Sequence, residues 1–215
     1  MLHKAPVIIS PKTFRLIQEL QQLPELKGFY LVGGTALALQ LGHRNSIDID
    51  LFTQSDFEED FVLNLLNPKY EVKEIFRRKN TIISLINNIK TGFIKHSYPL
   101  ILPPITEEGI TFLSKEDIAA MKFHAIVQSG KRLKDFIDVH YLLQHFSMAQ
   151  MLEFFTRKYS FSNPMIAMKA LNFFDEIDEN IDPPKLINPI SLAQIKKRIQ
   201  EATLKPSKIF LSLKA

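Results

Sequence analysis

The stretch from Phe29 to Phe52 constrains the fold of this chain more than any other part of the sequence. It opens with a short apolar run, Phe29–Val32, which predicts a buried strand. Two glycines, 33 and 34, follow at once and lead into an amphipathic helix that we expect from Thr35 to about Leu41. Alternating apolar and acidic residues over 47–51 then predict a second strand with one polar face.

The two glycines and the start of the helix have the properties of a phosphate-binding turn. Glycine has no Cβ, so a ligand or another backbone can approach closely and unusual φ and ψ angles are allowed. The first amides of a helix carry partial positive charge, which suits a phosphate group. If the ligand is a nucleotide, we expect Gly33, Gly34 and Thr35 to hold its β and γ phosphates.

Two carboxylates, Asp48 and Asp50, form the acidic half of the alternating segment. Side chains at i and i+2 of a strand point the same way, so these two should stand side by side. The opposite, buried face is expected to comprise Ile47, Ile49 and Leu51. Neighbouring carboxylates repel unless a cation lies between them, and Mg²⁺ bound by carboxylates and substrate phosphates is the usual resident. A lone Gly-Gly is usually a turn and a lone Asp-x-Asp a solvated strand edge, but their combination favours a nucleotide site.

The same residues carry a family resemblance. Gly33-Gly34-Thr35-Ala36-Leu37 and, after a gap of 13 residues from Gly34, Asp48-Ile49-Asp50-Leu51-Phe52 resemble the nucleotidyltransferase superfamily, whose signature is a Gly-Gly or Gly-Ser turn followed by Asp-x-Asp. Within it, the Arg44-x-Ser46 string that precedes the acids is similar to the AbiEii/AbiGii type IV toxin branch. The resemblance implies that Arg44 and Ser46 belong to the nucleotide site, with Arg44 steadying the triphosphate or bracing the Asp-x-Asp strand.

The sequence departs from the superfamily pattern at Gly92. Members carry a third carboxylate on a later strand, and the match of Lys90-Thr91-Gly92-Phe93 to that strand places glycine at its position. The nearest acids, Glu71 and Glu74, fall on a different expected strand. The third metal ligand is therefore absent, supplied elsewhere or unused.

A second match to the toxin branch lies on two helices after Pro103-Pro104. These relatives carry a lysine on the first helix and an Arg/Lys-Asp-x-x-Asp string on the second, and Lys122 and Lys134-Asp135-Phe136-Ile137-Asp138 fill those places. A lysine on a mostly apolar helix needs an anion, so Lys122 either contacts a phosphate or pairs with Asp138. Asp135 or Asp138 would orient Lys122 or accept the proton of the attacking group. The resemblance covers about Phe29 to Leu143.

Local signals predict the remaining elements. Ser10 and Pro11 begin a helix to about Leu23, and Ser114 caps another that ends near Gln128. Further helices are expected at 57–66, 135–145, 148–157, 164–174 and 191–202, and strands at 70–76, 81–86 and 89–94.

Composition limits the class of protein. The chain has no cysteine, which excludes disulfides and thiolate metal sites and is compatible with the cytoplasm. It has no run of 18 apolar residues, so no membrane span is expected. The net charge of +4 is a mild basic bias. Basic clusters at 77–79, 131–134 and 196–198 are either solvated faces or an RNA-facing surface.

Together these observations predict an α/β protein with a small mixed-sheet nucleotidyltransferase core at 1–103 and a helical region at 104–215. The resemblance implies Mg²⁺-dependent transfer of a nucleoside monophosphate from an NTP to a hydroxyl of RNA, for example tRNA, or of protein. It also implies a role as the toxin of a toxin–antitoxin or phage-defence system, with an antitoxin protein as partner. The alternatives are a non-catalytic module that binds nucleotide, RNA or a partner through a degenerate metal site, and a kinase-like enzyme that releases NDP.

Overall fold

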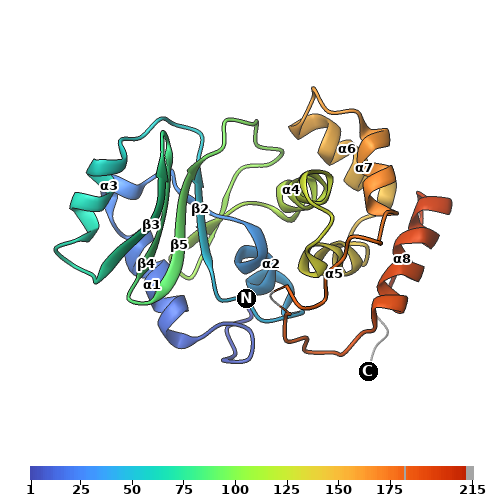
Figure 1. Cartoon of the computed structure of the whole chain (residues 1–215), viewed down its shortest axis with the longest axis horizontal. Coiled ribbons are helices and arrows are strands. Elements are labelled where there is room, and N and C mark those ends of the chain that lie inside the picture. Colours follow the sequence, from blue (N-terminus) through green and yellow to red (C-terminus); the bar gives the residue numbers. More distant parts are fainter. Residues whose placement is uncertain (182, 212–215) are drawn as a thin grey trace. The chain divides into compact units, whose positions relative to one another are not determined.

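The structure is a computed structural model that describes residues 1–181 and 183–211 (Figure 1). It divides into two compact units. The sheet unit comprises Met1–Tyr98 and Pro104–Leu113, and the helical unit comprises Pro99–Pro103 and the chain from Ser114 onward. The predicted α/β class is confirmed. The segment that follows Pro103-Pro104 adds two strands to the sheet before the helices begin.

One mixed seven-stranded sheet, in the order β3-β4-β5-β2-β1-β7-β6, organises the described part of the sheet unit. β1 is antiparallel to β2 and parallel to β7, while β2 is parallel to β5. The short β1 joins the two halves of the sheet because it pairs with β2 on one side and with β7 on the other. The strands are β1 (Tyr30–Leu31), β2 (Ile49–Thr53), β3 (Val72–Arg78), β4 (Thr81–Ile86), β5 (Ile89–Lys95), β6 (Ile105–Glu107) and β7 (Ile110–Phe112).

The hairpin of β4 and β5 follows from its turn residues. Asn87 and Asn88 both have positive φ, of 49° and 64°. A two-residue hairpin turn with both central residues in this region matches the right-handed twist of the strands, and asparagine tolerates it well. The predicted strands at 81–86 and 89–94 are confirmed, and β5 extends one residue further, to Lys95.

The helices of the sheet unit are α1 (Pro11–Gln21), α2 (Gly33–Leu41) and α3 (Glu59–Leu66), with a 3₁₀ turn at Pro24–Leu26. α1 begins as predicted, because Ser10 Oγ accepts the Thr13 amide at 3.0 Å. α3 begins later than the expected Phe57. The Phe57 ring instead packs edge-on against Phe29, and its amide donates to Asn80 Oδ1 at 2.8 Å.

The described part of the helical unit contains five helices: α4 (Lys115–Gln128), α5 (Leu133–Leu142), α6 (Met148–Lys158), α7 (Pro164–Leu171) and α8 (Leu192–Leu204). α4 packs against α5, α6 and α7, and α8 packs on α5 (Figure 1). Ser114 caps α4 as predicted, accepting the Asp117 amide at 3.0 Å. None of the described helices is both long and apolar enough for a membrane span, and α4, with 14 residues, falls short of the roughly 20 that a span needs.

A buried ion pair fixes the first segment of the helical unit. Lys158 Nζ lies 2.8 Å from Asp117 Oδ1 and donates to the Pro99 carbonyl at 3.0 Å. Asp117 also accepts two backbone amides of Pro99–Pro103 and the hydroxyl of Ser114. Neither charged side chain has exposed surface. Each charge therefore depends on these partners to offset its loss of hydration.

Candidate active site

The glycine turn lies between β1 and α2, and each glycine is required for a different reason. Gly33 has φ of +67°, in the left-handed region that disfavours a side chain, and its missing Cβ would lie 3.2 Å from Asp50 Oδ2. A Cβ on Gly34 would lie only 2.5 Å from Arg44 Nη2. Because neither glycine has a side chain, the backbone of the turn can lie close to Asp50 and Arg44, which come from later in the chain.

Arg44, Thr35 and Ser46 form a buried support beneath this turn. Arg44 is 1% exposed, and its Nη1 donates to the Asn45 carbonyl at 2.8 Å. The Thr35 hydroxyl lies 2.8 Å from Ser46 Oγ and donates to the Asp48 carbonyl. These contacts tie the first turn of α2 to the segment that leads into β2. Arg44 lies against Gly34, where a Cβ would be 2.5 Å from its Nη2. The first amides of a helix have no acceptor within the helix, so those of α2 could bind a ligand.

Asp48 precedes β2 and Asp50 is its second residue. Both are half-buried, and the Asp50 carbonyl accepts the Val32 amide at 2.9 Å, which anchors β2 to β1. The expectation that Ile47 is buried is wrong, since 57% of its surface is exposed. Pairing in β2 begins only at Ile49, so Ile47 lies outside the pleat that buries the other apolar residues of this segment.

Gly92 lies directly beside Asp50. The two residues are partners in the register of β5 and β2, and paired residues on neighbouring strands face the same side of the sheet. A Cβ on Gly92 would lie 3.4 Å from Asp50 Oδ1. Glu74 does not replace the missing acid, because β4 separates its strand from β5 and its carboxylate accepts two hydrogen bonds from Arg77. The position without a carboxylate therefore adjoins Asp50.

The donor set suits one magnesium ion only with help from a substrate. Carboxylate oxygens are the ligands that Mg²⁺ prefers, and Mg²⁺ commonly takes one or two of them together with phosphates and water. Asp48 and Asp50 supply that number. Across residues 1–181 and 183–211, no group of three or more His, Cys, Asp or Glu side chains is placed to hold a metal ion. The residues therefore fit an ion that binds with the nucleotide.

The three charged residues singled out in the helical unit come together. Lys122 Nζ lies 2.8 Å from Asp135 Oδ1 and 2.7 Å from Asp138 Oδ2. All three side chains are buried, with exposed fractions of 6%, 2% and 0%. The pairing of Lys122 with Asp138, one of the two alternatives that the sequence left open, is therefore present.

One carboxylate oxygen of Asp135 makes no hydrogen bond to the described residues around it. Its Oδ2 is buried without a hydrogen-bond partner among the described residues, and Arg132 Nε lies 3.5 Å away. Two cations thus face two carboxylates in this cluster. Arg132 was missed as a member, although its i,i+3 spacing from Asp135 is a signal for such a contact.

Comparison with known families agrees with this geometry. The family model of the AbiEii nucleotidyl transferase toxin of type IV toxin–antitoxin systems matches residues 15–99 and 82–207. The chain belongs to this family. An uncharacterised protein of Aquifex aeolicus (strain VF5) is 33% identical over 165 residues, which are 72% of this chain and 80% of the relative. The AbiEii match extends well beyond Leu143, where the resemblance visible in the sequence ended.

Two solved structures from Helicobacter pylori share the fold. One is JHP933, with a TM-score of 0.52 and 16% identity over 91% of this chain and 89% of that one. The other is described as a candidate nucleotidyltransferase, with a TM-score of 0.54 and 16% identity over 91% and 92% of the two chains. At this level of identity the likeness concerns the fold alone.

Proposed function

We propose that this AbiEii family member is a Mg²⁺-dependent nucleotidyltransferase that moves an NMP from an NTP to a hydroxyl of RNA, for example tRNA. The observation that carries the proposal is the position of Asp50. Its carboxylate packs between the backbones of Gly33 and Gly92, next to the start of α2. A carboxylate beside a helix start that suits phosphate would repel the nucleotide unless a cation joined them.

The chemical step exchanges one phosphorus–oxygen bond for another. The acceptor oxygen forms a bond to the α phosphorus, the bond from that phosphorus to the bridging oxygen breaks, and pyrophosphate leaves. The amides of Gly33, Gly34 and Thr35 hold the β and γ phosphates, while Asp48 and Asp50 hold Mg²⁺. A bound Mg²⁺ supplies positive charge that offsets the charge on the phosphates. Arg44 and Ser46 support this site by fixing the glycine turn and the Asp48 segment.

The acceptor proton requires a base, and Asp135 is our candidate for it. Its Oδ2 has no hydrogen-bond partner among the described residues and lies 3.5 Å from Arg132 Nε, whereas Asp138 Oδ2 is held closely by Lys122 at 2.7 Å. Lys122, which lies 2.8 Å from Asp135 Oδ1, would orient Asp135. Asp135→Asn should lower kcat with little change in the KM for NTP. Asp138→Asn also removes one counter-ion of the buried Lys122, so it should cost a similar amount of stability without the same loss of kcat.

The biological setting follows the family. We propose that the protein acts in the cytoplasm as the toxin of a toxin–antitoxin pair, with an antitoxin protein as its regulator and NTP as its substrate. The family description names a type IV toxin. RNA is preferred to protein as the acceptor because the chain carries a surplus of basic residues, with 27 Lys and Arg against 23 Asp and Glu.

Gly92 favours a second candidate function, which is a module that binds nucleotide without transferring it. Release of pyrophosphate separates the two. Purified protein with total tRNA, Mg²⁺ and each NTP should release pyrophosphate, and chelation of the metal should stop it. Asp48→Asn and Asp50→Asn should abolish release, whereas Glu25→Gln, an exposed carboxylate of the same unit, should not. NTP binding without release from any NTP would favour the binding module.

A further inference from the structure

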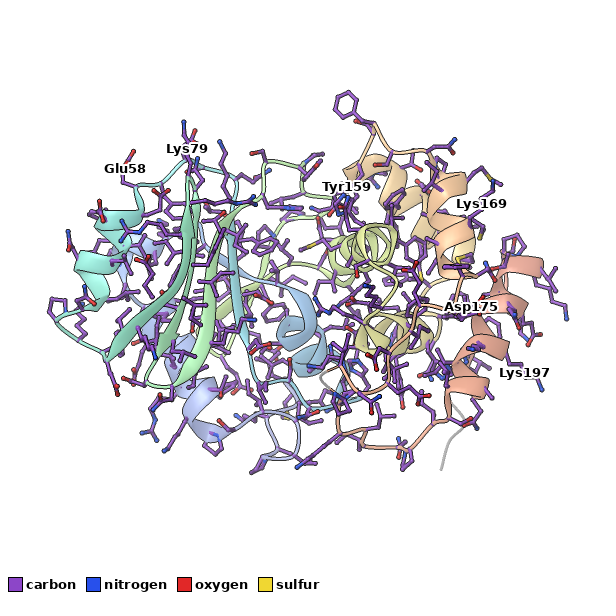
Figure 2. All side chains as sticks on the ribbon, viewed as in Figure 1. Glu58, Lys79, Tyr159, Lys169, Asp175 and Lys197 are labelled. Atoms are coloured by element: carbon purple, nitrogen blue, oxygen red, sulfur yellow. The ribbon has the colours of Figure 1, made fainter. Side chains whose placement is uncertain are left out.

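The helical unit contains a basic pocket that the proposed transfer does not use. It has a volume of about 280 Å³ and lies between α5, α8 and the segment that follows α8. The residues that line it are His140, Ile190, Gln194, Lys197, Arg198, Glu201 and Phe210. The basic cluster expected at 196–198 therefore lies partly in a hollow, and Lys197 is seen on α8 in Figure 2.

Arg198 is the central cation of this pocket. It is half-buried, and its Nη1 donates to the His140 carbonyl at 3.1 Å. Burial lowers the pKa of its guanidinium. Among the described residues no carboxylate lies within ion-pair distance of it, so the cation is partly desolvated without a counter-charge. Such a group gains most when an anion binds, because a charge removed from water needs a partner.

The ring of Phe210 holds the guanidinium in place. Arg198 Cζ lies 5.5 Å from the ring centroid, and Lys208 Nζ lies 4.7 Å from it. The Phe210 amide donates to the Leu143 carbonyl at 2.9 Å, which fixes the segment to the end of α5. Cations therefore cover the face of the Phe210 ring. A ligand in the pocket would bind through positive charge and hydrogen-bond donors, not by stacking on this ring.

The charges around the pocket favour an anion. Glu201, the only acid among the described residues that line the pocket, lies 2.8 Å from Lys208 Nζ and 3.4 Å from Lys205 Nζ. Lys197 and Arg198 are left to act on a ligand. The side-chain oxygen of Gln194, Oε1, accepts the Ser191 backbone amide at 2.7 Å. The side-chain NH₂ group of Gln194 is left as a further donor.

The wall of the pocket contains an unsatisfied polar atom. His140 is 4% exposed and its Nδ1 is buried without a hydrogen-bond partner among the described residues. Burial, with a smaller contribution from the neighbouring Arg198, lowers the pKa of His140 to about 3, so the imidazole is neutral at physiological pH. Unsatisfied buried polar atoms are rare in native proteins and often accompany functional positions.

We propose that this pocket binds a phosphate group, carried either by a small phosphate ester or by the backbone of RNA. A guanidinium with free N–H groups matches the oxygens of phosphate, and a second cation beside it suits a ligand with more than one negative charge. The volume is large enough for a phosphate with part of a ribose but lies below the range of pockets that enclose whole drug-sized ligands. None of the residues that line the pocket belongs to the proposed transfer site, which uses Asp48, Asp50, the glycine turn and, for the acceptor proton, Asp135 with Lys122.

Direct binding, without NTP or Mg²⁺, tests the proposal. Inorganic phosphate, acetate, AMP and a ten-nucleotide RNA are titrated by calorimetry into the intact chain and into Arg198→Gln and Lys197→Gln. We expect Arg198→Gln to weaken binding of the preferred ligand by about 10- to 100-fold, the effect of losing hydrogen bonds to a charged group. Arg157→Gln, which removes an exposed arginine of α6, is the matched control and should bind normally.

The outcomes separate the sources of the phosphate. Arg198-dependent binding of AMP assigns a small ester, and Arg198-dependent binding of RNA alone assigns a phosphodiester. Equal binding of acetate and phosphate, or equal affinities for Arg198→Gln and Arg157→Gln, would overturn the assignment. If Arg198→Gln fails to fold, the exposed Lys197→Gln must still weaken binding. Asp48→Asn/Asp50→Asn should leave this binding unchanged, so failure of the transfer proposal would not affect it.

Discussion

Replacing Gly92 with aspartate tests whether position 92 faces the Asp50 carboxylate. The register of β2 and β5 places this position beside Asp50, with room for a Cβ at 3.4 Å from Oδ1. Neighbouring strands lie about 4.8 Å apart, so a carboxylate at position 92 would lie roughly 5 Å from that of Asp50. Coulomb's law then gives a repulsion of about 3 kcal/mol at an effective dielectric constant of 20, falling to about 1 kcal/mol where water screens the pair.

We therefore expect Gly92→Asp to lower the free energy of unfolding by about 1–3 kcal/mol in the absence of metal. For a chain of this size, that corresponds to a fall in melting temperature of about 2–4 °C per kcal/mol. Mg²⁺ should reverse the loss, because a cation between carboxylates converts repulsion into binding. The assay is thermal unfolding with and without Mg²⁺.

Gly92→Asn is the control, since its side chain has nearly the same shape without the charge. It should show no dependence on Mg²⁺ beyond that of the unmodified protein. If Gly92→Asp and Gly92→Asn melt at the same temperature without metal, and Mg²⁺ stabilises both equally, then position 92 does not face the Asp50 carboxylate. The conclusion that Gly92 occupies the place of a third metal-binding carboxylate would then be refuted.

Three further changes test other parts of the structure. Gly34→Ala would bring a Cβ to 2.5 Å from Arg44, so we expect about 1–3 kcal/mol of destabilisation and weaker NTP binding by calorimetry, whereas Gly130→Ala, where the nearest atoms are 4.0 Å away, should do neither. Lys158→Met leaves a buried carboxylate without its counter-ion and should lower the free energy of unfolding in urea by about 3–5 kcal/mol; a loss below 1 kcal/mol would contradict this. The pKa of His140 is lowered from an ordinary 6.5 to about 3 in the folded chain. Between pH 3 and pH 6.5 the unfolded chain therefore binds a proton at His140 more readily than the folded chain does. Stability should therefore be complete above pH 6.5 and fall by about 2 kcal/mol by pH 5, and His140→Phe should reduce this slope in denaturant titrations.

The local half of the site could be predicted from the sequence. The glycine turn, the cap at Ser10 and the β4–β5 hairpin depend on residues close together in the chain, and their backbone preferences are strong. The position of Gly92 beside Asp50 was also foreseen, but only through resemblance to a family. No local pattern reports which strands become neighbours in a sheet.

The contacts that the sequence could not reveal are between residues far apart in the chain. Apolar periodicity marked Ile47 as buried, but burial depends on where pairing with β5 begins. The pair formed by Asp117 and Lys158 spans 41 residues, and each partner alone is typical of a solvated helix. Arg198 likewise looked like part of a surface cluster, because only the packing of α8 on α5 half-buries it.

The most direct test of nucleotidyl transfer compares two positions of the label in one NTP. Purified protein, total tRNA and Mg²⁺ are incubated with each NTP labelled either at the α or at the γ phosphate, alongside Asp48→Asn/Asp50→Asn. We predict that RNA acquires the α label and never the γ label, and that the double variant transfers neither. Transfer of the γ label would identify a kinase. Absence of label on RNA and protein, despite demonstrated NTP binding, would contradict nucleotidyl transfer.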